Sequence, residues 1–156
     1  MTNQEIKTIQ SLHKKKFRKE LNRFIIEGRK IIEQSLENQP ERIQQVYALE
    51  SEQNWLTETA LPVTYISARE LEKITVLQHP QGVLAICTME TSQAENTTFQ
   101  LALDTIQDPG NMGTILRLAS WFGVDEVLLS IDCVDIYNPK VVQASMGSIV
   151  RVQCRY

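Results

Sequence analysis

The strongest constraint on this chain is an alternation of helical and strand patterns that runs twice and is interrupted once. In the first half, short apolar runs predict strands over 24–28, 42–49, 63–67 and 82–89. The spacing of apolar residues predicts helices over 3–16, 29–38, 52–60 and 68–74. Ser67 and Glu70 have the spacing of a capping box at the start of the last helix. This α/β rhythm fits one small domain.

A polar stretch over 90–100, ETSQAENTTFQ, shows neither the apolar spacing of a helix nor that of a strand, and it separates the two halves. After it the alternation restarts, with strands expected over 99–106, 125–130 and 148–156 and helices over 112–122 and 138–147. The sequence therefore predicts an α/β protein with one domain over 1–90, a linker over 91–98 and a second domain over 99–156.

Cysteine and histidine usage limits the chemistry that the chain can perform. Its three cysteines are far apart without a CxxC spacing, and no carboxylate motif accompanies its two histidines. We therefore expect a reduced, cytoplasmic protein without a metal site. No apolar run approaches the roughly 18–20 residues of a membrane span and no signal peptide opens the sequence, so we expect no membrane contact.

Charge is distributed unevenly, although the formal net charge is only −3. Residues 1–30 hold nine Lys or Arg against three Glu, whereas the other 126 residues hold seven against sixteen acidic residues. A basic arm on an acidic body is typical of proteins with an anionic partner such as nucleic acid. A lysine-rich, solvated helix face has the same composition, so composition leaves both interpretations open.

The stretch DTIQDPGNMGTILRLASWFG, residues 104–123, joins a strand end to an apolar helix. Residues 108–111 favour turns, so we expect a turn there, with Asn111 or Thr114 as the helix cap and Gly123 at the left-handed position after the helix. The helical spacing predicts a face that packs on the sheet, made of Ile115, Leu118, Ala119 and Phe122.

Arg117 flanks this apolar face in the first turns of the expected helix. Open α/β sheets bind ligands where a strand ends and a helix begins, and helix amides together with an arginine suit a phosphate. A capped helix with one surface arginine explains the same residues. The glycines do not form GxGxxG, which makes a Rossmann-type oxidoreductase a distant alternative.

Two motifs in order resemble the SpoU/TrmH group of RNA 2′-O-ribose methyltransferases, in the knotted SPOUT superfamily. The first is DPGNMG followed by Arg117 and Phe-Gly at 122–123, and the second is NPKVVQASMG at 138–147. FIIEGRKIIEQSL and GVLAIC resemble the family's substrate-binding domain. The resemblance implies an α/β chain with an L30e/L7Ae-like N-terminal domain followed by an incomplete Rossmann-like SPOUT (α/β knot) domain.

The resemblance also implies methyl transfer from S-adenosylmethionine to a ribose 2′-hydroxyl of structured RNA, either ribosomal or transfer RNA. It makes Arg117 the catalytic arginine and Asn111 its partner. A free guanidinium has a pKa above about 12 and is a poor base, so we expect Arg117 to bind phosphate and stabilise alkoxide charge. With RNA as the partner, the following cations are expected to contact it: Lys14, Lys15, Lys16, Arg18, Lys19, Arg23, Arg29, Lys30 and Lys140.

The family's third signature, an apolar strand ending in Gly-x-Glu and followed by a Ser-Leu-Asn turn, does not occur in the sequence. The resemblance assigns to that signature the knot and nearly all contacts to the methyl donor. We therefore expect no S-adenosylmethionine site in this chain, an inactive N-terminal fragment of the enzyme, and an exposed strand edge that favours self-association. The intact protein is expected to be a homodimer. The alternative function is a non-catalytic RNA-binding module.

Overall fold

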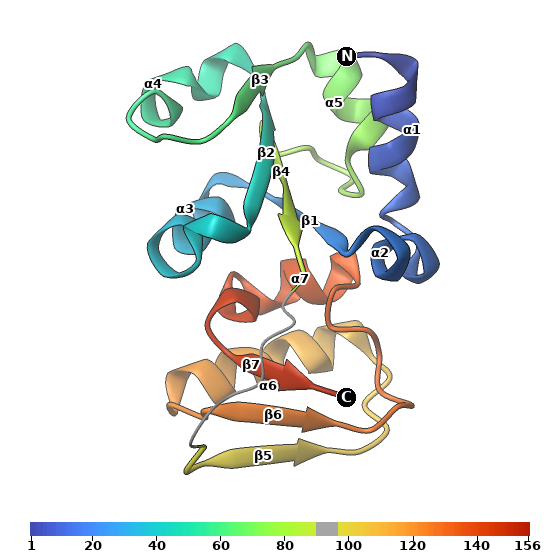
Figure 1. Cartoon of the computed structure of the whole chain (residues 1–156), viewed down its shortest axis with the longest axis vertical. Coiled ribbons are helices and arrows are strands. Elements are labelled where there is room, and N and C mark those ends of the chain that lie inside the picture. The colour runs from blue at the N-terminus through green and yellow to red at the C-terminus, as the bar shows by residue number, and fades with distance from the viewer. Residues whose placement is uncertain (90–96) are drawn as a thin grey trace. The chain divides into compact units, whose positions relative to one another are not determined.

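The computed structural model describes residues 1–89 and 97–156, which fall into two compact units, Met1–Met89 and Glu90–Tyr156 (Figure 1). The expected linker at 91–98 lies mostly outside the described residues. Each unit has its own sheet and its own helices.

The first unit is built on a four-stranded sheet in the order β1-β4-β2-β3. β4 runs antiparallel to both of its neighbours, whereas β3 pairs in parallel with β2. The strands are β1 (Arg23–Glu27), β2 (Ile43–Ala48), β3 (Val63–Tyr65) and β4 (Val83–Thr88). The helices are α1 (Asn3–Ser11), α2 (Lys15–Leu21), α3 (Arg29–Asn38), α4 (Gln53–Leu56) and α5 (Ala68–Ile74), with 3-10 turns η1 (Pro40–Arg42) and η2 (Glu50–Glu52).

Helices cover both faces of this sheet, with α1 and α5 on one side and α3 on the other (Figure 1). β1 and β4 are buried along nearly their whole length because both faces are covered. Ile25 and Leu84 belong to the core layer formed with α1 and α5. The predicted capping box of α5 is confirmed, since Ser67 Oγ accepts from the Glu70 amide and the Glu70 carboxylate accepts from the Ser67 amide.

The sequence predicts one helix over 3–16, and this prediction is wrong in its extent. α1 ends at Ser11, a turn follows, and α2 begins at Lys15. The turn lets Leu12 pack into the core with 1% of its surface exposed. The Leu12 carbonyl accepts a 2.8 Å hydrogen bond from Arg18 Nη1, which holds the two helices in this arrangement.

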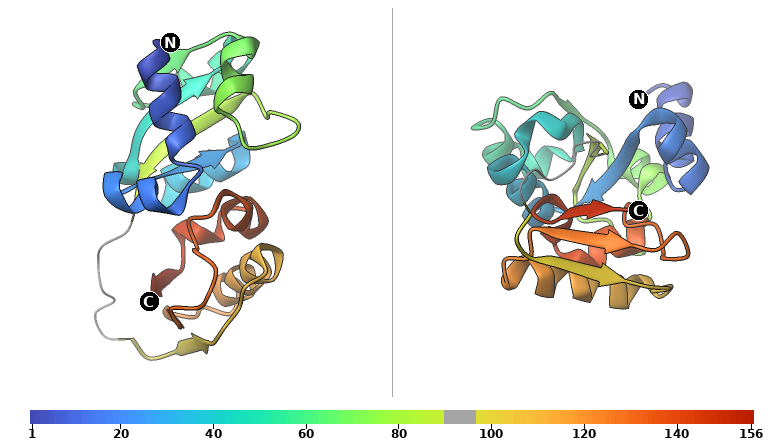
Figure 2. Two further views of the ribbon diagram at one scale, coloured as in Figure 1. Left: turned by 90° about the vertical axis from the view of Figure 1, so that its right-hand side faces the viewer. Right: turned by 60° about the horizontal axis from the view of Figure 1, so that its bottom comes forward.

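The second unit has a three-stranded parallel sheet in the order β5-β6-β7. Its elements are β5 (Gln100–Leu103), α6 (Pro109–Trp121), β6 (Glu126–Leu129), α7 (Pro139–Ser145), the 3-10 turn η3 (Ser148–Val150) and β7 (Gln153–Arg155). Both helices lie on the same face of the sheet (Figure 2). The two connections, from β5 to β6 and from β6 to β7, step across the sheet in the same direction, and right-handed crossovers of this kind place their helices on one face. Val127 and Leu129 are buried beneath them, and the alternation of a strand turns Glu126 and Leu128 to the opposite face.

The strand predicted over 148–156 is confined to 153–155. Ile149, Val150 and Val152 are buried although they lie in η3 and the turn after it. Their burial comes from packing and not from strand pairing, so a buried turn produced the apolar pattern of a strand.

Candidate functional site

The helix α6 begins three residues earlier than the sequence predicts, and its N-cap is Asp108. The Asp108 carboxylate accepts a 2.7 Å hydrogen bond from the Asn111 amide, and Pro109 occupies the first helical position. The prediction that Asn111 or Thr114 caps the helix is therefore wrong, because the turn formers are themselves the helix start. The predicted left-handed position after the helix is confirmed, since Gly123 has a φ of +68°.

The buried face of α6 also differs from the predicted one. The buried residues are Met112, Gly113, Leu116 and Ala119. Of the residues predicted to pack on the sheet, Leu118 is 52% exposed and Phe122 is 69% exposed. The helix is therefore rotated about its axis relative to the orientation that its apolar residues suggest.

Gly113 explains this rotation, because α6 passes α7 there at backbone distance. A Cβ atom on Gly113 would lie 2.4 Å from the Ala144 Cβ and 2.7 Å from the Ala144 carbonyl carbon. Any side chain at this position would push the two helices apart. The glycine of the first motif thus packs directly against the second motif.

The helix α7 begins as α6 does, with a capping side chain followed by proline. Asn138 is its N-cap, the Asn138 Oδ1 accepts a 3.0 Å hydrogen bond from the Lys140 amide, and Pro139 takes the first helical position. Ser145 is fully buried and donates from Oγ to the Val142 carbonyl at 2.7 Å. The two motifs therefore start the two helices of this unit and meet where those helices pack.

Arg117 is exposed and makes no hydrogen bond or ion pair with any residue that the structure describes. It is the ninth residue of α6, about 12 Å along the axis from Pro109, so the prediction that it lies in the first turns is wrong. Asn111 is six residues away, which places the two side chains about 120° apart around the axis. The backbone N–H of Asn111 donates to the Asp108 carboxylate, which fixes Asn111 in the first turn of the helix. The two predicted catalytic residues are thus on one helix but are not brought together.

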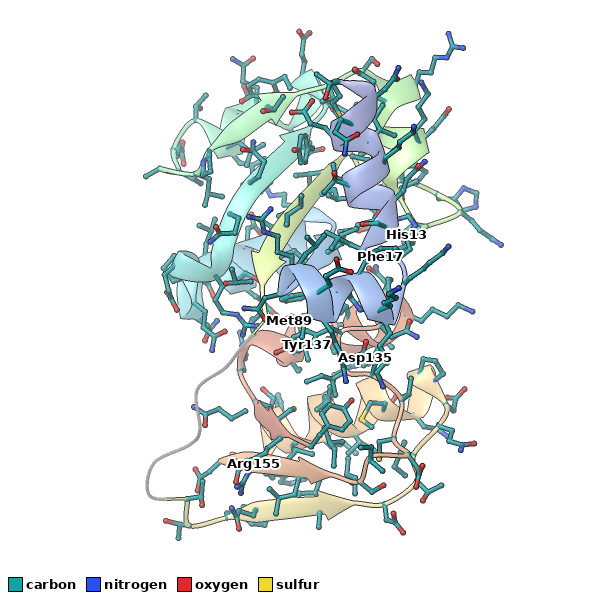
Figure 3. All side chains as sticks on the ribbon, turned by 45° about the vertical axis from the view of Figure 1, so that its right-hand side comes forward. His13, Phe17, Met89, Asp135, Tyr137 and Arg155 are labelled. Atoms are coloured by element: carbon teal, nitrogen blue, oxygen red, sulfur yellow. The ribbon has the colours of Figure 1, made fainter. Side chains whose placement is uncertain are left out.

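A cavity of about 480 Å³ opens at the carboxyl ends of β5, β6 and β7, the edge where open α/β sheets bind ligands. Apolar side chains, one carboxylate and one guanidinium line it: Ala102, Leu103, Asp104, Leu128, Leu129, Ser130, Arg155 and Tyr156. Arg155, labelled in Figure 3, is held by the buried carboxylate of Glu126 through an ion pair of 3.0 Å.

Tyr156 fastens the loop between β6 and α7 to the end of β7. Its hydroxyl accepts a 3.0 Å hydrogen bond from the Ile136 amide and donates one of 2.8 Å to the Val134 carbonyl. Burial raises the pKa of Tyr156 above its ordinary value, so the phenol stays protonated and remains a donor.

Most of the cations predicted to contact RNA lie on the surface of the first unit. The exposed ones are Lys14, Lys15, Lys16, Lys19, Arg23, Arg29 and Lys30. Arg18 differs, because it is 2% exposed and its guanidinium donates to the Leu12 carbonyl. Arg18 therefore supports the turn between α1 and α2 and is not presented to a phosphate. In the second unit Lys140 is exposed.

Trp55 is a surface feature that the sequence reasoning missed. The guanidinium of Arg29 lies over its ring, with Cζ 5.1 Å from the ring centroid. Trp55 Nε1 donates to Glu52 at 2.8 Å, and Arg29 Nε donates to Glu33 at 2.6 Å. Arg29 and Trp55 stand on different helices and belong to no local motif, so only the fold brings them together.

Within the described ranges, no three His, Cys, Asp or Glu side chains lie close enough together to hold a metal ion. None of the described helices is long and apolar enough to cross a membrane.

Two family models match the chain on either side of the segment that divides the units. The model of the MRM3-like substrate binding domain matches residues 3–85, and the SpoU rRNA Methylase family matches residues 98–156. The chain belongs to the SpoU rRNA methylase family. The resemblance of the two motifs to SpoU/TrmH enzymes is thereby confirmed.

Known SpoU and TrmH proteins are similar along nearly the whole chain. The 23S rRNA (guanosine(2553)-2′-O)-methyltransferase RlmP of Bacillus subtilis is 31% identical over 147 residues, which cover 94% of this chain and 59% of that protein. A TrmH-family structure from Porphyromonas gingivalis is 32% identical with a TM-score of 0.86, covering 99% of this chain and 62% of its own. The AdoMet-bound rRNA methyltransferase of Sinorhizobium meliloti is 28% identical with a TM-score of 0.82, covering 99% and 61%.

These likenesses confirm the fold class, an L30e/L7Ae-like α/β domain followed by a Rossmann-like SPOUT domain. The chain spans about three fifths of the length of these relatives. In this SpoU family chain both predicted motifs, with Asn111, Arg117 and Lys140, lie within the methylase match, and the basic arm lies within the substrate-binding match.

Proposed function

We propose that the chain carries the RNA-binding domain and the first part of the catalytic domain of an S-adenosylmethionine-dependent ribose 2′-O-methyltransferase. Its substrate would be ribosomal or transfer RNA, and its location the cytoplasm. The observation that carries the proposal is the pairing of two matches in order, a substrate-binding domain over 3–85 and the SpoU methylase over 98–156. The Bacillus subtilis relative bears a 2′-O-methyltransferase name, which supports the position of the methyl group.

In this proposal Arg117 binds the phosphate beside the reacting ribose and stabilises the alkoxide that forms at the 2′-oxygen. Its guanidinium is exposed and unengaged by the described residues, so its donors are available to a substrate. Asn111 lies at the start of the same helix, where it would contact the RNA separately from Arg117. The proton of the 2′-hydroxyl must go to another group, because a guanidinium is a poor base.

The test is to replace the arginine that corresponds to Arg117 by lysine in a family enzyme that is competent for methyl transfer. Lysine keeps the charge but loses the two-pronged geometry, so we expect kcat to fall by about 10²–10³, as for the loss of one oxyanion donor. A rate near that of the unchanged enzyme would refute the assigned role. Arg69→Lys, at an exposed arginine of the first unit, is the matched control.

The basic arm supplies affinity without sequence information. The exposed cations on and beside α2 would contact phosphates and release counterions: Lys14, Lys15, Lys16, Lys19 and Arg23. Lys140 would add one contact from the second unit. Each alanine substitution should lower the salt dependence of RNA binding by about one counterion, whereas Arg18→Ala should act on folding because Arg18 is buried.

For the methyl donor, we propose that residues 1–156 hold an incomplete site. The residues that line the cavity at the carboxyl edge are the strand ends and the residues directly after them, which supports a partial site. The family's third signature is absent from the sequence. Residues 1–156 alone should therefore bind RNA, fail to bind S-adenosylmethionine and transfer no methyl group. The alternative, a non-catalytic RNA-binding module, predicts the same outcome. The two functions are distinguished by adding the missing catalytic segment of a family enzyme, which should restore methylation only if the chain is part of a methyltransferase.

A homodimer of the intact protein is also proposed. An apolar stripe is formed by Leu118 and Trp121 on α6 and by Phe122 directly after it, which are 52%, 84% and 69% exposed. Exposed apolar patches of a few hundred Å² mark interaction surfaces in folded proteins. Trp121→Ser should raise the dissociation constant of the dimer in sedimentation equilibrium, and an unchanged constant would exclude this stripe from the interface.

A further inference from the structure

We propose that Arg29, stacked on Trp55, is a preformed platform for an unpaired RNA base and is not a phosphate contact. The inference rests on the proposed RNA-binding function and deepens it, because it names the kind of RNA that the first unit prefers. The preferred substrate is a stem with a single-stranded loop or bulge.

The Arg29–Trp55 pair is held together by contacts on both side chains. Trp55 supports one face of the Arg29 guanidinium, with Cζ 5.1 Å from the ring centroid. Glu33 accepts from Arg29 Nε at 2.6 Å, and Glu52 accepts from Trp55 Nε1 at 2.8 Å. Each member of the pair thus has a carboxylate partner that favours its orientation before any ligand arrives. Preorganisation reduces the entropy lost when a ligand binds.

One face of the Arg29 guanidinium is open to solvent. The Arg29 side chain retains 56% of its accessible surface, so the guanidinium is not covered by Trp55 on both sides. Its Nη groups donate no hydrogen bond to the residues that the structure describes. A flat, solvent-facing cation with a fixed orientation is the surface on which unstacked RNA bases pack, and its free donors can reach base edges.

The charge around Arg29 differs from the charge around α2. Arg29 and Lys30 stand beside two carboxylates, Glu33 and Glu52, each within hydrogen-bonding distance of the stacked pair. The attraction for phosphate at this place is therefore largely cancelled. Around α2, by contrast, one carboxylate accompanies five exposed cations: Lys14, Lys15, Lys16, Lys19 and Arg23 against Glu20. Phosphate contacts belong to the arm, and base stacking fits the Arg29–Trp55 pair.

The side-chain amide of Gln81 also lies close to Arg29 in the chain fold, beside Gly28. Gly28 has a φ of +96°, and the Gln81 Oε1 lies 2.1 Å from the point where a Cβ would stand. The exposed Gln81 side chain therefore lies beside Gly28, the residue that precedes Arg29 at the start of α3. A primary amide here can donate to and accept from the edge of a stacked base.

The experiment measures binding of the 156-residue chain to two RNAs of equal length at one salt concentration, a hairpin with an unpaired loop and a blunt duplex. Arg29→Lys keeps the charge and removes the plane, so it should weaken hairpin binding about fivefold or more and leave duplex binding within twofold. Arg69→Lys is the matched control and should change neither constant, since Arg69 is exposed in the same unit and stacks on no ring among the described residues. Thermal melts of each variant check the fold.

A second readout uses the fluorescence of Trp55, which lies beneath the Arg29 guanidinium. In a Trp121→Phe background Trp55 is the sole tryptophan, and the hairpin should quench its fluorescence more than the duplex does. If the wild-type chain binds RNA but Arg29→Lys binds the hairpin as tightly as wild type, the platform is refuted and the proposed function stands. If the wild-type chain binds neither RNA, the proposed function fails, and the platform fails with it.

Discussion

Replacing Gly113 by alanine tests the idea that the two sequence motifs are packed against each other through this one position. Gly113 lies in the first motif on α6, and Ala144 lies in the second motif on α7. If the close approach of the helices is required, adding one methyl group should destabilise the second unit measurably.

The size of the effect follows from the distances. The new Cβ would stand 2.4 Å from the Ala144 Cβ and 2.8 Å from the Ser145 amide nitrogen. Carbon atoms in contact prefer about 3.5–4.0 Å, so the helices must separate by about 1 Å. Overpacking of this kind costs about 1–3 kcal/mol, and the gain of about 1 kcal/mol from replacing a helical glycine offsets only part of it. We expect a net loss of about 1–2 kcal/mol.

The assay is amide hydrogen exchange of α6 and α7, which reports on the second unit alone. Gly110→Ala is the matched control on the same helix, because its Cβ would meet only the Asp108 carboxylate, at 3.1 Å, and should protect α6 as well as glycine does or better. Adding Ala144→Gly to Gly113→Ala should restore part of the protection, since it removes the closest atom. Equal protection in Gly113→Ala and Gly110→Ala would refute the packing argument.

Three further results are expected. Burial raises the pKa of the Cys87 thiol to about 12, so Cys87 should resist a thiol reagent at pH 8 in the native chain and react once the chain is unfolded; labelling of native Cys87 would contradict this. The hydrogen bond from the N-terminal ammonium, with those from Ser67, lowers the pKa of Glu70 to about 2. The stability that the Glu70 carboxylate contributes is therefore present above its ordinary pKa and lost as pH falls toward 2. N-terminal acetylation should raise the pKa of Glu70 in an NMR titration, and an unchanged pKa would exclude the ion pair between Glu70 and the Met1 ammonium. Glu27 is 4% exposed and accepts hydrogen bonds from Thr75 Oγ1 and the Val76 amide. Glu27→Gln should therefore lower the free energy of unfolding in urea by about 1–3 kcal/mol, whereas Glu20→Gln, at an exposed position, should leave it unchanged.

Local signals in the sequence predicted those parts of the fold that local chemistry decides. The Ser67–Glu70 capping box and the left-handed Gly123 depend on neighbours within a few residues, and both are confirmed. The order of helices and strands was also accessible, because apolar periodicity reflects burial on one face or two. The motif resemblance supplied the family, which periodicity could not.

Other features were predicted wrongly, one because a local signal was ambiguous and two because the deciding partner lies outside the local pattern. Asp108 and Pro109 carry the start signal of α6, yet the run of turn formers suggested a turn in place of a helix. The rotation of α6 follows from the backbone of α7 against Gly113, which no pattern within the helix reveals. Arg18 is one cation among many in the sequence, and only the position of the Leu12 carbonyl distinguishes it as structural.

The measurement that tests the central claim most directly is titration calorimetry of residues 1–156 with a structured ribosomal RNA fragment and, separately, with S-adenosylmethionine. We predict binding of the RNA through the basic arm and the Arg29–Trp55 pair, and no detectable binding of the methyl donor if its site is incomplete as proposed. Clear micromolar binding of S-adenosylmethionine would place the donor site within residues 98–156, and absence of RNA binding would remove the substrate-binding role of the first unit.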